Sequence, residues 1–220
     1  MKLIKFIYIS LLCIIATACS DDNPPSSVAS FTDVALIKDI NESGTTFAIA
    51  GNENNIPTRL HSSNILHSED TELKGTCIVI SYTFADESTG EINLRGASII
   101  SNFNAISDEK QNIEGWNTDI IRLMSYWTIE RRIILRAQLP YSPEKRRLEL
   151  VVNNTTLSHQ YPEAFLFHSL EGTIDPADTF YRTYYIAFNI DEISESIDWK
   201  GLKIHINDPE LKSNPITIEF

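Results

Sequence analysis

The chain has 220 residues, with 18 Lys and Arg against 30 Asp and Glu, so its net charge at pH 7 is −12. This acidic balance argues against binding to nucleic acids or to anionic lipid headgroups, because both carry negative charge themselves. Hydrophobic residues make up 42% of the chain, which is enough for one large apolar core or two smaller ones.

The N-terminus has the three parts of an export signal. Lys2 and Lys5 supply positive charge, the apolar run Phe6–Ile15 follows, and the small residues Ala16–Ala18 lead to Cys19. The apolar run is too short to cross a bilayer, which takes roughly 20 residues. We therefore predict a signal peptide that is removed, and not a permanent membrane-spanning helix.

The segment ending at Cys19 resembles the bacterial lipobox, in which the cysteine thiol is acylated and becomes the new N-terminus. Ala16 departs from the pattern, since leucine is commonest at that position. We predict that residues 1–18 are the signal peptide and that lipid on Cys19 holds the protein on a membrane, because each buried CH₂ adds about 0.8 kcal/mol of membrane affinity. The alternative is an ordinary secreted protein cleaved near Ala18.

Residues 19–30 are rich in Pro, Ser and Asp, a composition that predicts a disordered tether. The run Ser20-Asp21-Asp22 resembles the surface-export signal of Bacteroidetes lipoproteins. The predicted location is therefore the outer membrane, with the cell surface favoured over the periplasmic face. Without residues 1–18 the mature chain has 16 basic and 30 acidic residues, a net charge of −14.

Cysteine usage leaves a single thiol in the mature protein. Cys13 leaves with the signal peptide and Cys19 carries the lipid, so only Cys77 remains and no intrachain disulfide can form. Cys77 lies in the apolar stretch Thr76–Ile80, where an unpaired cysteine behaves as a small hydrophobic residue. We expect it to be buried and chemically inert.

Alternation of apolar and polar residues with period two dominates the mature chain and predicts an all-β protein. In Thr183–Ile190, for example, Tyr184, Ile186, Phe188 and Ile190 fall on one face. Short helices are expected only near Glu192–Ile197 or Pro209–Lys212. The predicted strands are Val34–Ile40, Thr45–Gly51, Thr58–Asn64, Thr76–Ala85, Glu91–Ser101, Ile120–Ile129, Arg132–Tyr141, Arg147–Asn153, Ala164–Leu170, Thr183–Ile190, Leu202–Asn207 and Pro215–Phe220.

The polar segment 108–117 interrupts this pattern and is predicted to be a linker. The five strands before it, in residues 31–107, suit an OB-like β-barrel. The seven after it, in residues 118–220, suit an immunoglobulin-like β-sandwich. Two similar sandwiches, as in fimbrillin-type lipoproteins, are the alternative, but no internal repeat supports that arrangement.

This layout resembles the NigD-like family of Bacteroidetes lipoproteins. The resemblance rests on the lipobox with its Ser-Asp-Asp run and on the segments Gly75–Tyr82, Ile99–Ile106, Asp119–Leu135 and Leu148–Asn153. It covers most of the mature chain as a layout, without a shared chemical motif, and the acidic tail and glycine-rich turns are sparser here. The resemblance implies an OB-like domain followed by a β-sandwich and implies no enzymatic activity.

No catalytic or metal-binding pattern is recognisable in the sequence. Of the five histidines, His61 and His67 are six residues apart, which is not a zinc-ligand spacing, and His159 and His168 match no known pattern either. There is no Gly-x-Ser-x-Gly elbow and no phosphate-binding glycine loop, and Asp175–Asp178 lacks the spacing of a calcium loop. We therefore predict no metal, no cofactor and no enzymatic activity, although a scattered active site leaves no such mark in a sequence.

Aromatic residues are the remaining candidates for a binding site, because flat rings stack on sugars and form protein interfaces. Tyr181 and Tyr185 alternate away from the apolar face of their predicted strand, and Trp116 and Trp199 lie in the linker and beside a turn. We predict a non-catalytic interaction module of the cell envelope with these four residues as ligand-binding candidates. Its partner stays open between an envelope glycan and an envelope protein, including a toxin in the case of an immunity protein.

Overall fold

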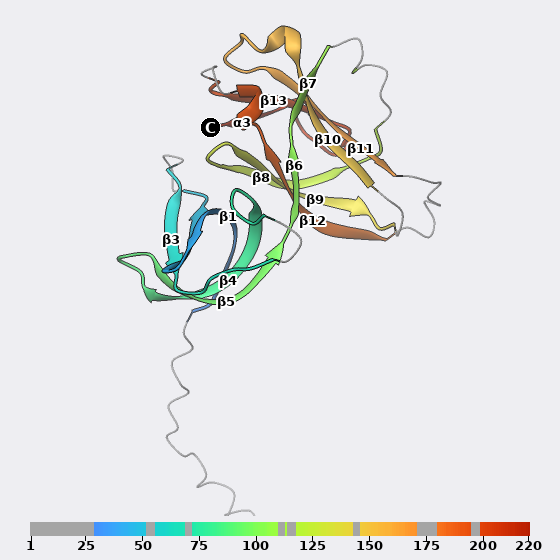
Figure 1. Ribbon diagram of the computed structural model, residues 1–220. Coiled ribbons are helices and arrows are strands. Elements are labelled where there is room, and N and C mark those ends of the chain that lie inside the picture. Colours follow the sequence, from blue (N-terminus) through green and yellow to red (C-terminus); the bar gives the residue numbers. More distant parts are fainter. Residues whose placement is uncertain are drawn as a thin grey trace, which may run out of the picture. The chain divides into compact units, whose positions relative to one another are not determined.

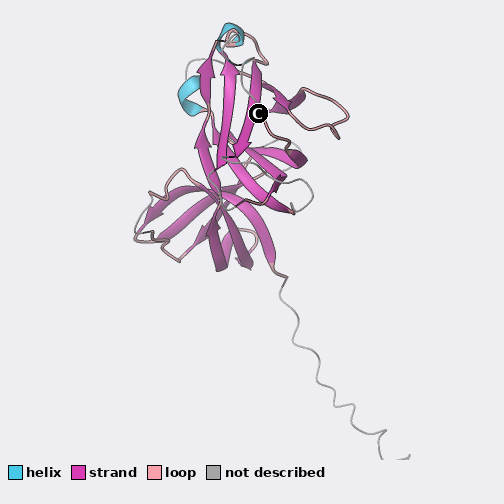
Figure 2. Cartoon of the chain, turned by 90° about the vertical axis from the view of Figure 1, so that its right-hand side faces the viewer, coloured by secondary structure: helices cyan, strands magenta, loops and turns pink. Residues whose placement is uncertain are grey.

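The computed structural model describes residues 29–51, 56–68, 72–109, 113, 118–142, 146–170, 180–194 and 199–220. These residues are almost entirely β-strand, as the magenta arrows of Figure 2 show. The signal peptide, Cys19 and Trp116 lie outside the described residues. Among those described, the regular helices are α3 (Asp191–Ser194) and the 3₁₀ turn η1 (Asn154–Thr156), so the all-β prediction is confirmed.

The first five strands form a closed barrel with the order β1-β2-β3-β5-β4 (Figure 1). Their apolar side chains point inward and form a core that includes Phe47, Leu60, Ile80 and Tyr82. Strand β1 is long enough to pair with both β2 and β4, which brings the two ends of the sheet together. The strands are β1 (Phe31–Asn41), β2 (Gly44–Ile49), β3 (Thr58–Ser62), β4 (Cys77–Asp86) and β5 (Glu91–Ile99).

The barrel closes where β3 meets β5 in parallel, at His61 and Glu91. Gly90 precedes this contact with a φ of +76°, a conformation that side chains with a Cβ rarely adopt. A Cβ at this position would lie 2.5 Å from the carbonyl oxygen of Arg59, and the carbonyl of Gly90 accepts the His61 N–H at 3.0 Å. Glycine is therefore required for the close approach that seals the barrel.

The remaining strands form two sheets, with the orders β14-β13-β11-β10-β7 and β6-β12-β9-β8. One apolar core contains residues from both sheets, so the sheets pack face to face as a sandwich. Tyr184, Ile186 and Phe188 of β12 point into this core, as their alternation predicted. The strands are β6 (Ser101–Asn104), β7 (Ile106–Asp108), β8 (Arg122–Ile129), β9 (Arg132–Pro140), β10 (Arg146–Asn153), β11 (Glu163–Leu170), β12 (Tyr181–Asn189), β13 (Gly201–Ile206) and β14 (Ile216–Glu219).

Strand pairing places the boundary between barrel and sandwich closer to the N-terminus than the predicted linker 108–117. Strand β6 pairs in parallel with β12, and β7 pairs in parallel with β10, so residues 101–108 belong to the two sheets of the sandwich. The barrel strands end at Ile99, and the chain enters the sandwich without an intervening polar turn. Residues Phe31–Phe220 form one compact unit, and the behaviour of its two halves as separate domains stays a prediction.

Cys77 lies where the barrel contacts the outer face of the β6-β12-β9-β8 sheet. Its side chain is fully buried, as expected, and burial raises the pKa of the thiol to about 12. The amide of Asn102 on β6 satisfies both backbone groups of Cys77, accepting its N–H at 2.7 Å and donating to its carbonyl at 2.9 Å. The apolar residues around this contact are Val34, Leu36, Ala48, Ile129, Ile134 and Ala187.

Candidate functional site

Of the four aromatic candidates, Trp199 is part of the sandwich core. Its side chain is 4% exposed, and its Nε1–H donates to the carbonyl oxygen of Leu157 at 2.8 Å. A ring in this position offers no face to a ligand at the surface. Trp116 lies outside the described residues, so the structure places only Tyr181 and Tyr185 near the surface.

Tyr181 and Tyr185 lie on the face of β12 that points away from the sandwich core, but they have different surroundings. Tyr185 is half-buried and packs against Trp127, with 6.4 Å between the ring centroids, beside the apolar contact with the barrel. Tyr181 lies four residues further from that contact, and the guanidinium of Arg122 on β8 lies 4.3 Å from the centroid of its ring. The two tyrosines therefore share a face without forming one stacking platform.

A second arginine lies over aromatic rings at the same end of β12. The guanidinium of Arg182 lies 4.2 Å from the centroid of Tyr141, and Tyr141 stacks on Phe180 at 4.7 Å. Phe180 is 53% exposed and Tyr141 37%, so both rings are accessible at the surface. We call the group Tyr141, Phe180 and Arg182 the arginine–aromatic surface. Arg122 and Tyr181 lie on the opposite face of the sheet, because Arg182 pairs with the core residue Leu139 and Tyr181 is its neighbour along β12.

Arginines stacked on rings change what these rings can bind. A guanidinium over a tyrosine occupies the face of the ring on which a sugar would stack, and it keeps N–H groups that can donate to a ligand. Such N–H groups form paired hydrogen bonds with carboxylates. Arg182 is exposed and joined to no carboxylate by an ion pair among the described residues. The surface therefore suits a protein that presents acidic and apolar groups better than a neutral glycan.

Sequence reasoning singled out Tyr181 but missed its partner Arg122, and it also missed Tyr141. Arg122 reaches Tyr181 because β8 and β12 both pair with β9, and Tyr141, directly after β9, reaches Phe180 through the same pairing. No local pattern around either residue indicates these contacts.

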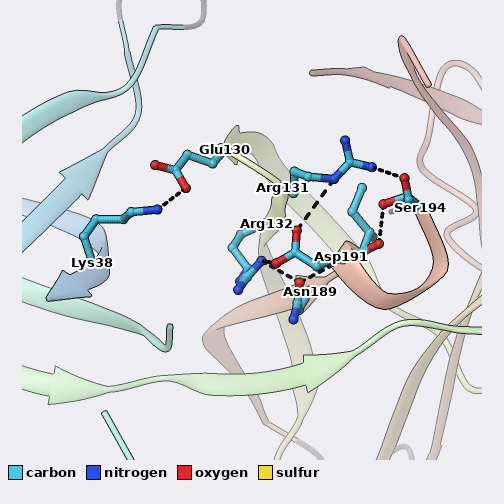
Figure 3. Close-up of polar contacts among 8 residues, drawn as sticks. Lys38, Glu130, Arg131, Arg132, Asn189, Asp191 and Ser194 are labelled. Atoms are coloured by element: carbon cyan, nitrogen blue, oxygen red, sulfur yellow. Dashed lines mark hydrogen bonds and ion pairs between the residues drawn. The ribbon is translucent and has the colours of Figure 1, made fainter. Parts of the chain in front are cut away.

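A network of ion pairs connects the hairpin between β8 and β9 to its neighbours (Figure 3). Arg132 donates to the side chains of Asp191 and Asn189, and Arg131 donates to the carbonyl oxygen of Ser194 at 3.2 Å. On the other side of the hairpin, Glu130 pairs with Lys38 of β1. Every carboxylate drawn in Figure 3 faces a cation, so this network holds elements together and offers no free acid or base.

His168 is the most strongly perturbed histidine among the described residues. It points into the sandwich core with no exposed surface, and neither ring nitrogen has a hydrogen-bond partner. Burial, together with the charge of Arg146, lowers the pKa of the imidazole to about 4. At neutral pH His168 is therefore an uncharged core residue, and no described nucleophile is hydrogen-bonded to it.

The described residues contain no group of three or more His, Cys, Asp and Glu side chains that could hold a metal ion. In the same part of the chain, no helix is long and apolar enough to cross a membrane.

The molecule is thus an all-β protein in which a closed barrel precedes a two-layered sandwich, and solved proteins of Bacteroidetes share this fold. A protein of unknown function from Bacteroides vulgatus ATCC 8482 is 19% identical, with a TM-score of 0.65 over 87% of this chain and 91% of that chain. A candidate lipoprotein from Bacteroides fragilis NCTC 9343 is 15% identical, with a TM-score of 0.59 over 87% and 98% of the two chains.

A NigD-like immunity protein from Bacteroides caccae ATCC 43185 is 12% identical, with a TM-score of 0.56 over 89% of this chain and 93% of that chain. The resemblance to NigD-like proteins is therefore confirmed at the level of the fold. No family model matches the chain, and no curated protein matches it in sequence.

Proposed function

We propose that the chain is a NigD-like envelope lipoprotein without catalytic activity, which binds a partner protein through the arginine–aromatic surface. The observation that carries this proposal is the exposure of stacked Tyr141 and Phe180 beside Arg182. Tyrosine and arginine are over-represented among the residues that dominate protein interfaces. The exposed guanidinium of Arg182, which no ion pair joins to a carboxylate among the described residues, favours a partner with carboxylates there.

The architecture supports this assignment. A five-stranded barrel with the order β1-β2-β3-β5-β4 and a parallel contact between β3 and β5 agrees with a barrel of the OB type. The two-layered sandwich has the size of an immunoglobulin-like domain, with short parallel pairs added by β6 and β7. Both halves leave loops and sheet faces available to a partner.

The proposed location is the outer membrane, with lipid on Cys19 and residues 19–30 as the tether. The lipobox-like N-terminus and the fold shared with a candidate lipoprotein support this location. Metabolic labelling with a clickable fatty acid should tag the wild-type chain and leave Cys19→Ala untagged. Equal labelling of the two chains would contradict the anchor, and protease treatment of intact cells distinguishes the cell surface from the periplasmic face.

Photo-crosslinking in the cells that make the protein tests the binding surface. A benzophenone amino acid at Phe180 should form one discrete protein adduct, which disappears when Arg182 is changed to Ser. The same probe at Ile56, an exposed residue of the barrel, is the matched control. Equal adducts at both positions, or an adduct that survives Arg182→Ser, would contradict the assignment of this surface.

Immunity against a toxin is a second candidate function, favoured by the fold shared with a NigD-like immunity protein. In that case the crosslinked partner would be the toxin, and cells that lack the chain would be killed by it. Two findings would argue against both candidates. One is binding of a neutral glycan that is lost in Tyr181→Ala, and the other is turnover of a glycan, peptide or ester that is lost on a single carboxylate or histidine change.

A further inference from the structure

Strand β10 has one edge that is only partly covered by strands among the described residues. Along its whole length, from Arg146 to Val152, it pairs with β11 on one side. On the other side, β7 pairs only with Val151–Asn153. No strand among the described residues pairs with that edge of Arg146–Leu150. An open strand edge presents a row of backbone N–H and C=O groups, to which another extended segment can add.

A cavity of about 540 Å³ lies along this open edge. The apolar side chains of Phe103, Ile106 and Leu148 line it, together with the charged group of Arg146. Ile106 is 42% exposed there, because the chain crosses from one sheet to the other between β6 and β7 and leaves the side of the sandwich open. The edge therefore has a volume beside it that can hold the side chains of an added strand.

Arg146 brings a positive charge to this cavity, and no carboxylate among the described residues pairs with it. Its guanidinium lies 4.9 Å from the centroid of Tyr184, and its Nη2–H donates to the carbonyl oxygen of Pro140 at 2.6 Å. Its Nη1 is buried and has no hydrogen-bond partner, and no ion pair joins Arg146 to a carboxylate among the described residues. The carboxylate of Asp119, which lies near His168, instead accepts the N–H of Leu170.

An arginine that is half-buried and uncompensated is unusual, because taking a charge out of water costs free energy that a partner charge normally offsets. His168 behind it stays neutral and supplies no negative charge. Glu149 does not help either, since its carboxylate pairs with Arg147 on the outer face of the sheet. The missing partner of Arg146 is therefore an anionic group that comes from outside the described residues.

We propose that the open edge of β10, at Arg146–Leu150, binds an extended peptide that adds as a further strand and places a carboxylate against Arg146. The backbone of the edge supplies the affinity, the cavity takes apolar side chains, and Arg146 selects for an acidic residue. This site goes beyond the proposed function, because none of its residues belongs to the arginine–aromatic surface.

A second copy of this chain fits the edge less well. If two β10 strands paired antiparallel around Leu148, with both cores on one face of the joined sheet, Leu150 of the other copy would lie opposite Arg146. The next residue of the other copy on that face would be Leu148, so the guanidinium of Arg146 would still have no carboxylate partner. Charge complementarity therefore favours a peptide from a different protein.

Selection from a phage library of random heptapeptides on the mature chain with Cys19→Ser tests this site. Wild-type protein should enrich peptides with Asp or Glu at one fixed position, and Arg146→Met should lose that preference. Arg95→Met, an exposed arginine on the barrel, should retain it. Replacing the selected acidic residue by its amide should weaken binding roughly 10- to 100-fold, as expected for a charge-assisted hydrogen bond. This readout stands even if Arg146→Met fails to fold.

Methylation of the peptide's amide nitrogens tests the added strand itself. Every second N–H of an added strand points toward the edge. Methylation at either the odd-numbered or the even-numbered positions of the peptide should therefore abolish binding, and methylation at the other set should be tolerated. Any of three results would overturn the proposal. These are no acidic preference beyond that of Arg146→Met, equal effects of methylation at both sets of positions, or a dimer in light scattering that Leu148→Lys dissociates.

Discussion

Replacement of Trp199 by Ala tests whether this residue stabilises the core or binds a ligand. The side chain is 4% exposed, so nearly the whole indole is removed from water on folding. An area of about 250 Å² at about 25 cal/mol per Å² amounts to roughly 6 kcal/mol of apolar transfer, an upper bound for the residue. Because the surroundings collapse in part around a truncated side chain, Trp→Ala changes in cores cost about 3–5 kcal/mol.

We expect Trp199→Ala to lower the free energy of unfolding by about 4 kcal/mol, which corresponds to a fall in Tm of roughly 8–16 °C for a domain of this size. Trp199→Phe keeps most of the apolar area but leaves the carbonyl of Leu157 without its donor, for a loss of about 1–2 kcal/mol. Urea unfolding followed by far-UV circular dichroism measures both changes.

Tyr181→Ala is the matched control, since this half-buried ring loses its contact with Arg122 and should cost only about 1 kcal/mol. The reasoning would be refuted if Trp199→Ala were as stable as Tyr181→Ala, or if it lost ligand capture while its stability stayed unchanged.

Three further predictions concern titration and accessibility. In the mature chain with Cys19→Ser, the thiol of Cys77 should not react with a thiol reagent until the protein unfolds, because it is buried and its pKa is about 12; prompt reaction at pH 8 would contradict this. The pKa of His168 is about 4 when folded and about 6.5 when unfolded, so the unfolded chain binds more protons between these values. Stability should therefore fall by up to about 3 kcal/mol as the pH drops from 6.5 to 4, and His168→Leu should abolish this part of the pH dependence. Limited proteolysis within 108–117 should leave two fragments that still co-elute in gel filtration, because β6 and β7 of the N-terminal fragment pair with β12 and β10; fragments that separate would contradict this pairing.

The strands and their inward faces could be predicted because they depend on local order along the chain. A period of two places Tyr184, Ile186 and Phe188 on one face whatever the partner strand is, and the structure confirms that face as core. The apolar stretch around Cys77 predicted burial for the same reason. The export signal is likewise local, since it depends on the order of charge, apolar run and small residues.

Pairing between distant strands decided the surroundings of individual side chains and the boundary between barrel and sandwich. No local pattern in the sequence encodes this pairing. Trp199 beside a predicted turn was a ligand-binding candidate, yet its ring is buried in the sandwich core and donates to the carbonyl oxygen of Leu157. The barrel passes into the sandwich inside what the alternation predicted as one continuous strand, because a change of partner needs no polar turn.

The same cause hid the contacts of Arg122 with Tyr181 and of Arg146 with Tyr184, and the open edge of β10. Each of these depends on the register and order of strands that are 38 to 59 residues apart in the chain. Side-chain periodicity determines which face of a strand is buried, whereas the neighbours of that strand are selected by the free energy of the whole packed sheet.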